Sequence, residues 1–515
     1  MSMNAVVRLI GYAAWLVKNI DENLVCEFHM ITKNNYLHMK QPRAILKTLT
    51  PFFILLLITS NLFANSVDIT KFGAKGDGVK LNTDAIQKAI DECANIGGGE
   101  VIVPQGTYVT GTLTLKDNVT LYLQTGAIIK GSIDIRDYPL HKALIYGGGA
   151  KNVAIRGYGA INGDGKAFPQ KDDSPGRPKL VVFDNCVNVL IQDVFLCNSA
   201  MWTLHLQKCD GVRINNINIF SHDNYNNDGI DIESKNVIIS DCNIDTDDDA
   251  IVFKSGDPEY IVENATVTNC ILSTNCNFIK FGTGSKGVFR NVSISNCSLK
   301  KSSVSSKFHP WPRIVWGVTA PTTGISGIAL EVVDGGSMDQ VAISNITMTD
   351  VQTPIFIRLG KRNTDERVGS LKNVIISGVV ATSQSFISSS ITGVQGQNVE
   401  NVTIRDCLFN VKGGGTASDA AKEVFEVPHF YPENRMFDQM LPSYGFYIRH
   451  GKNIVLDNVQ LRYHTGKEER HAIVAEDVSL LQIRNSMWEK PVGSLESLRI
   501  KDCPDIILRD NIETK

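Results

Sequence analysis

The sequence predicts an all-β fold, a right-handed parallel β-helix with a short N-terminal capping helix. Three observations lead to this prediction. A short phrase recurs along the chain, each copy alternates apolar and polar residues and is rich in Val and Ile, and no long segment of helical periodicity separates the copies. The third observation argues against βαβ units, which place a helix between parallel strands. The 42 glycines fit a chain with many turns.

The repeated phrase opens on asparagine in most of its copies. Most successive copies start 23 to 36 residues apart, and the starting residues are Asn152, Asn188, Gly211, Asn236, Asn264, Asn291, Gln340, Asn373, Asn401 and Asn453. One strand of this length cannot bury its own apolar face, so we expect the coils to stack on one another. Asparagine at the start fits a turn, where its side chain can bond the backbone and stack on the next coil's asparagine.

Four cysteines support the same register. Cys242, Cys270, Cys297 and Cys407 each lie six positions after the first residue of their phrase. We therefore expect them at equivalent inward positions in different coils. Side chains in a parallel ladder point the same way, which is poor disulfide geometry. The pattern thus predicts buried, reduced thiols, and the 11 cysteines show no CxxC metal spacing.

A helix is expected before the first repeats, in the segment 67–132. Thr83 is the expected N-cap, and apolar residues follow it with helical spacing at Ala85, Ile86, Ala89, Ile90 and Cys93. An amphipathic helix here would cover the open end of the solenoid and protect its core and edge strands.

Three ranges organise the chain. Residues 39–64 have the pattern of a secretory signal peptide, with basic residues, a short apolar run at 51–58 and Ala64 at a plausible cleavage point. An uncleaved anchor is the alternative, but the run is shorter than the roughly 20 residues of a membrane span. We therefore expect residues 1–38 to be an upstream extension from a start codon assigned too early. We expect residues 65–515 to form a single β-helix domain of an exported protein, periplasmic or extracellular, without a membrane span.

The charge balance gives no reason to expect a nucleic-acid partner. The chain carries 51 Lys+Arg against 54 Asp+Glu, a formal net charge of -3. Hydrophobic residues make up 43% of the sequence, which is enough to close a core. We expect a monomer.

Two acidic phrases occupy neighbouring coils. The first, HDNYNNDGIDIES, contains Asp228 and Asp231, and the second, DTDDDAIVFKSG, contains Asp247, Asp248 and Asp249. Both follow the strand phrase of their coil at a similar offset, so they should lie side by side. Hydrolysis with inversion needs such a cluster, because one carboxylic acid protonates the leaving oxygen and one carboxylate activates water. A solvated turn and a calcium site are the alternatives, but the second phrase matches an EF-hand loop poorly.

These phrases resemble those of glycoside hydrolase family 28, the polygalacturonase family of parallel β-helix pectinases, and the resemblance extends roughly over 67–511. Its segments are FGAKGDG, NTDAIQKAI and GGGEVIVPQGTY near the start, NSAMWTLHLQKCDGV at 198–212, NNDGIDI and DDDAIVFKSG. The resemblance implies that Asp248 is the general acid and that Asp228 and Asp249 hold and deprotonate the water. It implies no metal and no cofactor.

The sequence also departs from the family pattern. CNFIKFGTGSKG lacks the histidine of the family's Gly-His-Gly and has Ile279 or Lys280 in that stretch. Ala329 and Glu331 take the basic positions of the family's Arg-Ile-Lys, which grips the substrate carboxylate. Homogalacturonan cleavage is therefore one candidate, and another pectic linkage, for example in rhamnogalacturonan, is a second.

Four residues are candidates for substrate binding, namely Lys280, His205, Glu331 and Arg358. Lys280 is a candidate to supply positive charge to a uronate, with a solvated lysine as the alternative. Arg358 lies in PIFIRLGKR, a basic segment that either lines the cleft or forms an exposed turn. For His205, a satisfied buried histidine beside the cleft is favoured over a catalytic one.

Long insertions at 305–321 and 413–443 contain aromatic residues that could form a sugar-stacking wall or pack on each other. Insertions that narrow a groove favour attack at chain ends.

The sequence thus predicts an inverting glycosidase that acts on galacturonic-acid-containing pectic polysaccharide or oligosaccharide. A calcium-dependent pectate-type lyase and a non-catalytic surface solenoid, such as an adhesin, are the alternatives.

Overall fold

The computed structural model describes residues 65–139, 142–170, 176–306, 323–464, 466–493 and 495–515. The chain divides after Ala64 into two units, and the second unit, Asn65–Lys515, is the one described. The expected upstream extension and signal peptide lie outside the described residues, and both stay predictions. None of the helices in these ranges is long and apolar enough to cross a membrane.

The first strands precede the acidic phrases. They are β1 (Ser66–Asp68), β2 (Asp77–Leu81), β3 (Gly99–Val103), β4 (Gly106–Thr110), β5 (Leu113–Leu115), β6 (Val119–Leu123), β7 (Ala127–Gly131), β8 (Ala143–Gly148), β9 (Lys151–Gly157), β10 (Ala160–Asn162), β11 (Lys179–Asp184), β12 (Val187–Gln192), β13 (Phe195–Cys197), β14 (Leu204–Asn215) and β15 (Asn218–Ser221).

The later strands begin at the first acidic phrase. They are β16 (Ile230–Ser240), β17 (Asn243–Thr246), β18 (Ile251–Ser255), β19 (Ile261–Thr268), β20 (Ile271–Thr274), β21 (Asn277–Ser285), β22 (Val288–Lys301), β23 (Ser326–Val332), β24 (Ser337–Val351), β25 (Thr353–Leu359), β26 (Ser370–Ser383), β27 (Ser389–Thr392), β28 (Val399–Val411), β29 (Ser443–Tyr463), β30 (His471–Val478), β31 (Leu481–Arg484), β32 (Met487–Glu489), β33 (Leu498–Lys501), β34 (Ile506–Arg509) and β35 (Ile512–Thr514).

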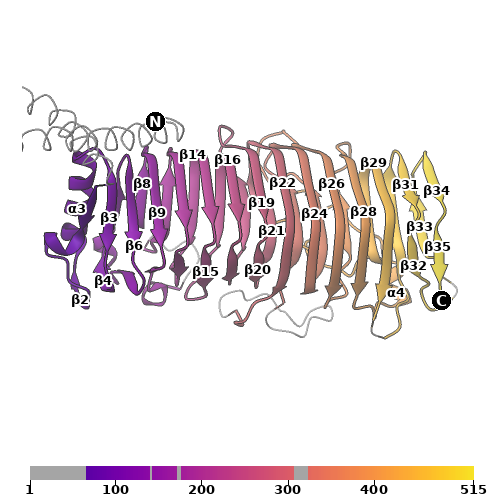
Figure 1. Ribbon diagram of the computed structural model, residues 1–515. Helices are drawn as coiled ribbons and strands as arrows, with labels where there is room; N and C mark the ends of the chain where they lie inside the picture. The colour runs from indigo at the N-terminus through magenta and orange to yellow at the C-terminus, as the bar shows by residue number, and fades with distance from the viewer. Residues whose placement is uncertain (1–64, 140–141, 171–175, 307–322, 465, 494) are drawn as a thin grey trace, which may run out of the picture. The chain divides into compact units, whose positions relative to one another are not determined.

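Helical structure is sparse in the described part of the chain. The α-helices are α3 (Thr83–Asn95) and α4 (Ala417–Ala420), and the 3₁₀ turns are η1 (Ile69–Phe72), η2 (Ile135–Asp137) and η3 (Gly165–Ala167). The strands pair in parallel, coil upon coil, as in β14–β16, β16–β19 and β22–β24 (Figure 1). One hydrophobic cluster from Val67 to Trp488 fills the interior. The fold is the predicted right-handed parallel β-helix.

The asparagines that open most of the repeats form ladders along the stack. Asn152, Asn236, Asn264 and Asn291 all have φ values of 54° to 56°, in the left-handed region. The side-chain amide of Asn264 donates to Asn236 Oδ1 at 2.9 Å, and that of Asn291 donates to Asn264 Oδ1 at 2.7 Å. Asparagine tolerates this conformation better than most residues, which explains why the repeat opens on it. The expected asparagine stack is confirmed.

The cysteine register is also confirmed. Cys242, Cys270, Cys297 and Cys407 are buried and unpaired. The first three lie in successive coils, since Ile271 N donates to Cys242 O and Ser298 N donates to Cys270 O, each at 2.9 Å. Packed against one another, these thiols act as small apolar side chains in the core.

Helix α3 lies at the N-terminal end of the described unit (Figure 1) and buries Ile86, Ala89, Ile90 and Cys93. The expected N-cap is wrong by one residue, because Asn82 is the cap and Thr83 is the first helical residue. The Thr83 hydroxyl instead accepts from Gly111 N at 2.8 Å. Thr83 therefore ties the helix to the neighbouring coil, and this long-range contact replaces the local cap.

The asparagine ladder leads to a stability prediction. Asn264→Ala removes two side-chain hydrogen bonds and leaves a β-carbon at a positive φ, so the free energy of unfolding should fall by about 1–3 kcal/mol. Asn264→Gly loses the same bonds but adopts this conformation without steric cost, so its loss should be smaller. Urea denaturation measures both. Equal losses in the two variants would show that the left-handed backbone is not the source of the asparagine preference.

Candidate active site

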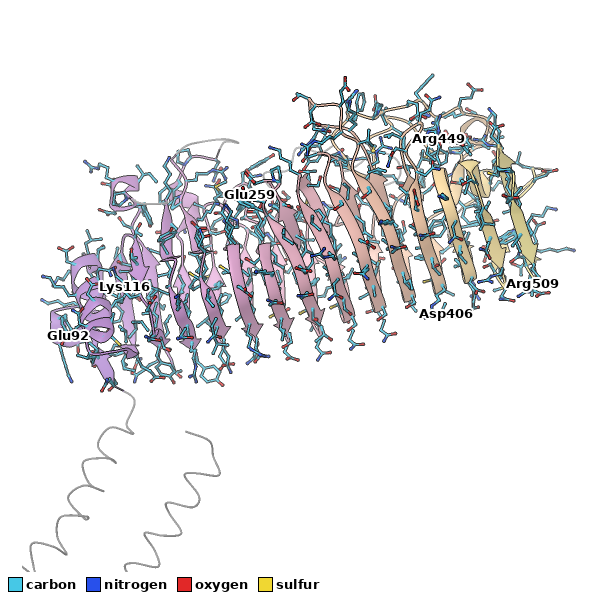
Figure 2. All side chains as sticks on the ribbon, turned by 90° about the horizontal axis from the view of Figure 1, so that it is seen from above. Glu92, Lys116, Glu259, Asp406, Arg449 and Arg509 are labelled. Carbon is cyan, nitrogen blue, oxygen red and sulfur yellow. The ribbon has the colours of Figure 1, made fainter. Side chains whose placement is uncertain are left out.

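The expected site residues lie on one outward face of the β-helix, where parallel register aligns them in columns across successive coils. One column contains His205, Asp231, Val252, Lys280, Ala329 and Phe356, from strands β14, β16, β18, β21, β23 and β25. In a neighbouring column, Glu331 of β23 lies beside Arg358 of β25. Figure 2 shows that loops project on the side of the stack that carries Glu259 and Arg449, away from Asp406.

The two acidic phrases meet at the turns that precede β16 and β18. Gly229 N donates to Asp249 O at 2.8 Å, and Asp248 N donates to Asn227 Oδ1 at 3.0 Å, so Asp228 lies one coil away from Asp249. Asp228 and Asp249 are each 3% exposed, and Asp248 is 8% exposed. The structure therefore brings the three predicted catalytic carboxylates together in a largely buried cluster.

Asp249 is held as a carboxylate by three hydrogen bonds. Its Oδ2 accepts from Lys280 Nζ at 2.9 Å, and its Oδ1 accepts from the backbone N and the amide Nδ2 of Asn277 at 3.1 and 2.8 Å. Burial raises the pKa of Asp249, but the charges of Lys280 and Lys254 and the Asn277 bond outweigh it and lower the pKa to about 2. Asp249 is thus ionised at neutral pH, and Lys280 is its buried counter-ion.

Lys254 plays the corresponding part for Asp228. Its Nζ lies 2.7 Å from Asp228 Oδ2 and also donates to Asp231 Oδ1. Burial raises the pKa of Asp228 to about 6 and that of Asp231 to about 7, against the opposing charge of Lys254. Asp228 therefore titrates near neutral pH, where a general base is most effective.

The backbone around Asp248 is fixed by its neighbours. The hydroxyls of Thr246 and Thr274 both donate to Asp248 O, and Asp248 Oδ1 accepts from Asp249 N at 2.8 Å. In the core below, Phe253 of β18 stacks on Phe281 of β21 with ring centroids 4.4 Å apart. Both sides of the turn are thus supported by packed coils, which suits a site that must hold its geometry.

One group of possible metal donors lies within this cluster, and it fits a metal poorly. The described residues bring ligand atoms of Asp248, Asp249 and Cys276 within 4.8 Å of one another. However, both oxygens of Asp249 are bonded to Lys280 and Asn277. Burial raises the pKa of the Cys276 thiol well above its usual value, so the sulfur keeps its proton, whereas a thiol ligand must lose it.

His205 and Glu233 flank the cluster on its N-terminal side. His205 is 3% exposed, with Nε2 3.3 Å from Glu233 Oε2 and Nδ1 3.1 Å from Lys179 Nζ. Burial lowers the pKa of His205. His205 is therefore a buried histidine with a contact to each ring nitrogen, and its part in substrate binding stays a prediction. Glu233 Oε1 accepts from Gly256 N at 3.1 Å, so both of its oxygens are bonded.

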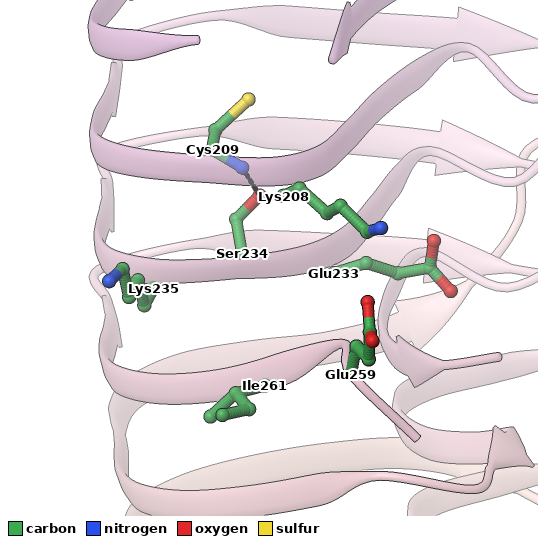
Figure 3. A pocket seen from close by; sticks show the side chains of 7 residues that line it. All are labelled: Lys208, Cys209, Glu233, Ser234, Lys235, Glu259 and Ile261. Carbon is green, nitrogen blue, oxygen red and sulfur yellow. Dashed lines mark hydrogen bonds between the residues drawn. The ribbon is translucent and has the colours of Figure 1, made fainter. Parts of the chain in front are cut away.

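Glu233 also lines a hollow at the adjoining corner of the β-helix, with a volume of about 250 Å³. Figure 3 shows Lys208 and Glu259 beside the Glu233 carboxyl group, while Lys235 and Ile261 line its other end. Lys208 lies with its Nζ 4.5 Å from the centre of the Tyr260 ring. Because the carboxylate of Glu233 is bonded to His205 and Gly256, the hollow offers no free acid from that residue.

Glu331 is a buried carboxyl group on the C-terminal side of the cluster. It is 1% exposed, and its Oε2 has no hydrogen-bond partner among the described residues. Burial raises its pKa to about 8, although the Lys280 charge opposes this shift. Glu331 is therefore neutral at pH 7, so it neither attracts nor repels a substrate carboxylate strongly.

Arg358, a candidate for substrate binding, is buried and bonded to backbone carbonyl groups, so it does not line a cleft. Its guanidinium is 3% exposed and donates to Gly393 O at 2.8 Å and Val427 O at 3.0 Å. These bonds tie the 413–443 insertion to the coils. Val427 and Met436 of that insertion pack on Ala329 and Phe356. The insertion thus covers the outward column just beyond Lys280.

The aromatic residues of this insertion differ from one another in exposure. Tyr431 is 50% exposed, and its ring centre lies 5.9 Å from Lys280 Nζ and 5.8 Å from Arg362 Cζ. Phe425 and Phe430 are 73% and 56% exposed. Tyr431 is thus the one of the three that lies beside the acidic cluster. His309, Trp311 and Trp316, the aromatic side chains of the 305–321 insertion, lie outside the described residues. A sugar-stacking wall formed by them stays a prediction.

A model of glycosyl hydrolases family 28 matches residues 93–428. The chain belongs to this family. It is 25% identical over 392 residues to a probable polygalacturonase of Arabidopsis thaliana, covering 73% of this chain and 80% of that protein. It is 30% identical over 240 residues to a probable rhamnogalacturonase A of Aspergillus oryzae, covering 45% and 49%.

Solved structures extend the likeness in fold. A hyperthermoactive exopolygalacturonase from Thermotoga maritima matches with a TM-score of 0.60 and 22% identity, over 79% of this chain and 93% of that one. This family 28 protein is a glycosidase, as predicted. The family-like phrases around Asp228 and Asp248 thus lie where the β-helix gathers its acidic side chains.

Three residues beside the acidic cluster of this family 28 protein were not predicted from the sequence. Lys254 neutralises Asp228 and Asp231, Asn277 holds Asp249, and Trp202 lies with its ring centre 3.9 Å from Lys254 Nζ. A signal existed for Lys254, because it lies two residues after the outward-facing Val252 and alternation places it on the same face. Asn277 lies in CNFIKFGTGSKG, the stretch that lacks the family's histidine. Its contact with Asp249, however, depends on the register between coils.

The buried Glu331 predicts a pH effect on stability. Its pKa is raised from 4.5 to about 8 in the folded state, so its contribution to stability is complete below pH 4.5 and is lost as the pH rises through 8. Glu331→Gln removes this contribution. Between pH 5 and 8, the unfolding free energy of the variant should therefore rise relative to wild type, by at most about 1.4 kcal/mol per pH unit.

Urea denaturation across this pH range measures the effect, and Glu259→Gln, a change on an exposed loop, is the matched control. Parallel stability curves for wild type and Glu331→Gln would contradict a neutral Glu331 in the fold.

Proposed function

We propose that this protein hydrolyses a glycosidic bond of galacturonic-acid-containing pectic polysaccharide or oligosaccharide, with inversion at the anomeric carbon. The observation that carries the proposal is the cluster of Asp228, Asp248 and Asp249, in which two different lysines neutralise two of the carboxylates. Inverting hydrolysis needs an acid and an ionised carboxylate within one cleft.

The environments of the three aspartates support a proposed role for each. Asp249, with its pKa lowered to about 2, is ionised, and its Oδ2, which accepts one bond from Lys280, can accept a second from the attacking water. Asp228, with its pKa near 6, takes a proton from that water. Asp248 is the most exposed of the three, at 8% against 3% for Asp228 and Asp249, so its carboxyl group is the best placed to reach a leaving oxygen in the cleft. Asp248 is therefore the acid that protonates the leaving oxygen.

The names of relatives support the substrate class. A probable polygalacturonase and a probable rhamnogalacturonase are both similar to this chain. On the C-terminal side of the cluster, Ala329 and Glu331 occupy the positions at which the family has Arg and Lys. Ala329 is covered by the insertion and Glu331 is neutral, so neither provides a cation there. This favours a substrate with a neutral sugar on that side, as in rhamnogalacturonan, over uniform homogalacturonan. Export to the periplasm or outside the cell would bring the enzyme to such a polymer, and we expect it to act as a monomer.

The first test is a substitution at the proposed acid. Asp248→Asn should lower kcat by at least about 10²-fold, because the amide cannot protonate the leaving oxygen. KM should change less, since the loss falls mainly in the transition state. Steady-state kinetics on pectic oligosaccharides measures both, and Asp257→Asn, in the loop after β18, is the matched control. Near-normal turnover in Asp248→Asn would remove the assignment.

The second test concerns the products. Proton NMR should show that the first-formed reducing end has the inverted anomeric configuration, because water attacks from the face opposite the leaving group. A chelator should leave the rate unchanged, and no ultraviolet-absorbing unsaturated sugar should form. Unsaturated product or loss of activity on chelation would favour a calcium-dependent lyase, and no turnover on any pectic substrate would favour a non-catalytic solenoid.

A further inference from the structure

The C-terminal side of the acidic cluster leaves few cations for a substrate carboxylate. Lys280 is bonded to Asp249, and Arg358 is bonded to backbone carbonyl groups. Arg362 donates to Asp334 Oδ1 and Oδ2 at 3.0 and 2.8 Å. A substrate that contains galacturonic acid therefore needs its positive partner elsewhere in the cleft.

Such a partner lies on the N-terminal side of the cluster. Lys179, the first residue of β11, is half-buried and forms no ion pair with any residue in the described ranges. Its Nζ lies 3.1 Å from His205 Nδ1 and 4.1 Å from the centre of the Trp202 ring. Lys179 is thus a cation beside the cluster with a neutral imidazole and an aromatic ring as its contacts.

The carboxylates whose charges act on Lys179, those of Asp231, Glu233 and Asp228, are each bonded to another group. Asp231 accepts from Lys254, and Glu233 contacts His205 and accepts from Gly256 N. Burial lowers the pKa of Lys179 even though these carboxylates oppose the shift. An anionic ligand would restore the balance, because an opposite charge in contact with a partly desolvated ammonium favours its charged form.

Trp202 provides a surface for a sugar ring at the same place. It is half-buried, contacts the His205 ring edge-on at a centroid distance of 4.8 Å, and lies next to both Lys179 and Lys254. Lys254 in turn is bonded to Asp228, so the indole lies within one side chain of the proposed base. The apolar C–H face of a pyranose can pack on such a ring while its charged group reaches the ammonium.

We propose that Lys179 and Trp202 form a subsite for a uronic acid residue of the substrate, with the uronate carboxylate bound to Lys179 Nζ and the sugar ring packed on the indole. The subsite lies on the Asp228 side of the cluster, opposite Glu331. This inference rests on the proposed function and deepens it, because it requires a free, unesterified carboxylate in the sugar on that side of the cleaved bond.

The test is a binding measurement that does not depend on turnover. Isothermal titration calorimetry compares an oligogalacturonate with the same oligosaccharide in methyl-esterified form, in an Asp248→Asn background. The Asp248→Asn protein should bind the free acid more tightly than the methyl ester. Adding Lys179→Met should weaken binding of the free acid by about 10-fold or more and change binding of the ester by less than about 3-fold, since only the charge contact is lost. Trp202→Ala should weaken both ligands to a similar extent.

Two further variants keep the test decisive. Lys208→Met, which removes another lysine that lies over an aromatic ring, is the matched control and should bind both ligands as the background does. If Lys179→Met fails to fold, Lys179→Gln keeps a polar contact to His205 and should show the same selective loss, while Lys179→Arg should retain the preference for the free acid.

The outcomes separate this inference from the proposed function. Equal weakening of both ligands by Lys179→Met, no weakening of either, or a background protein that does not prefer the free acid would overturn the subsite, even if the wild-type enzyme hydrolyses pectin. Selective loss of free-acid binding would support the subsite even if hydrolysis by wild type followed another course.

Discussion

Each coil of this β-helix can bury its apolar face only against the coils on either side of it, and the rest of the structure depends on this constraint. It forces parallel register over the whole stack, with inward residues such as Phe253 and Phe281 in contact from coil to coil. Register then acts on the outward face as well. His205, Asp231 and Lys280 belong to different coils, yet they share one column because the residues beneath them must stack.

The same stacking brings acidic side chains together and places a lysine beside each of two aspartates. Asp228 and Asp249 are brought together in a buried place, where like charges are costly. Lys254 and Lys280, from adjacent strands of the same face, each bond one of them. The two lysines act unequally, since Asp249 is held with a pKa near 2 while Asp228 shares Lys254 with Asp231 and titrates near 6. Asp249 is therefore ionised at neutral pH, whereas Asp228 binds and releases a proton near pH 6.

The insertion at 413–443 decides which side of the cluster is apolar. Its Val427 and Met436 cover Ala329 and Phe356, and Arg358 holds it in place from below. On the other side, beside Trp202, lies Lys179, which forms no ion pair with any residue that the structure describes. A substrate of alternating charge, with an acidic sugar on one side of the cleaved bond and a neutral sugar on the other, would match this asymmetry.

The local sequence pattern was enough to determine the repeat, the strands and the two acidic phrases. An asparagine at positive φ and alternating Val and Ile are properties of a few neighbouring residues, so the ladder at Asn264 and the thiols of Cys242 and Cys270 could be predicted. The N-cap of α3 was misplaced, because Thr83 bonds Gly111, far away in sequence, instead of its own helix.

Tertiary structure decided which charges meet. Lys280 was a candidate for a uronate contact or a solvated lysine, and it is bonded to Asp249. Arg358 was a candidate to line the cleft or an exposed turn, and it is bonded to the insertion. The sequence contains these cations, but the partner of each depends on the register between coils and on the reach of a flexible side chain. Neither the register nor the reach can be predicted from the spacing of residues along one strand. The sequence by itself therefore determined the β-helix and its acidic turns, while only the stacking of coils decided which lysine neutralises which aspartate.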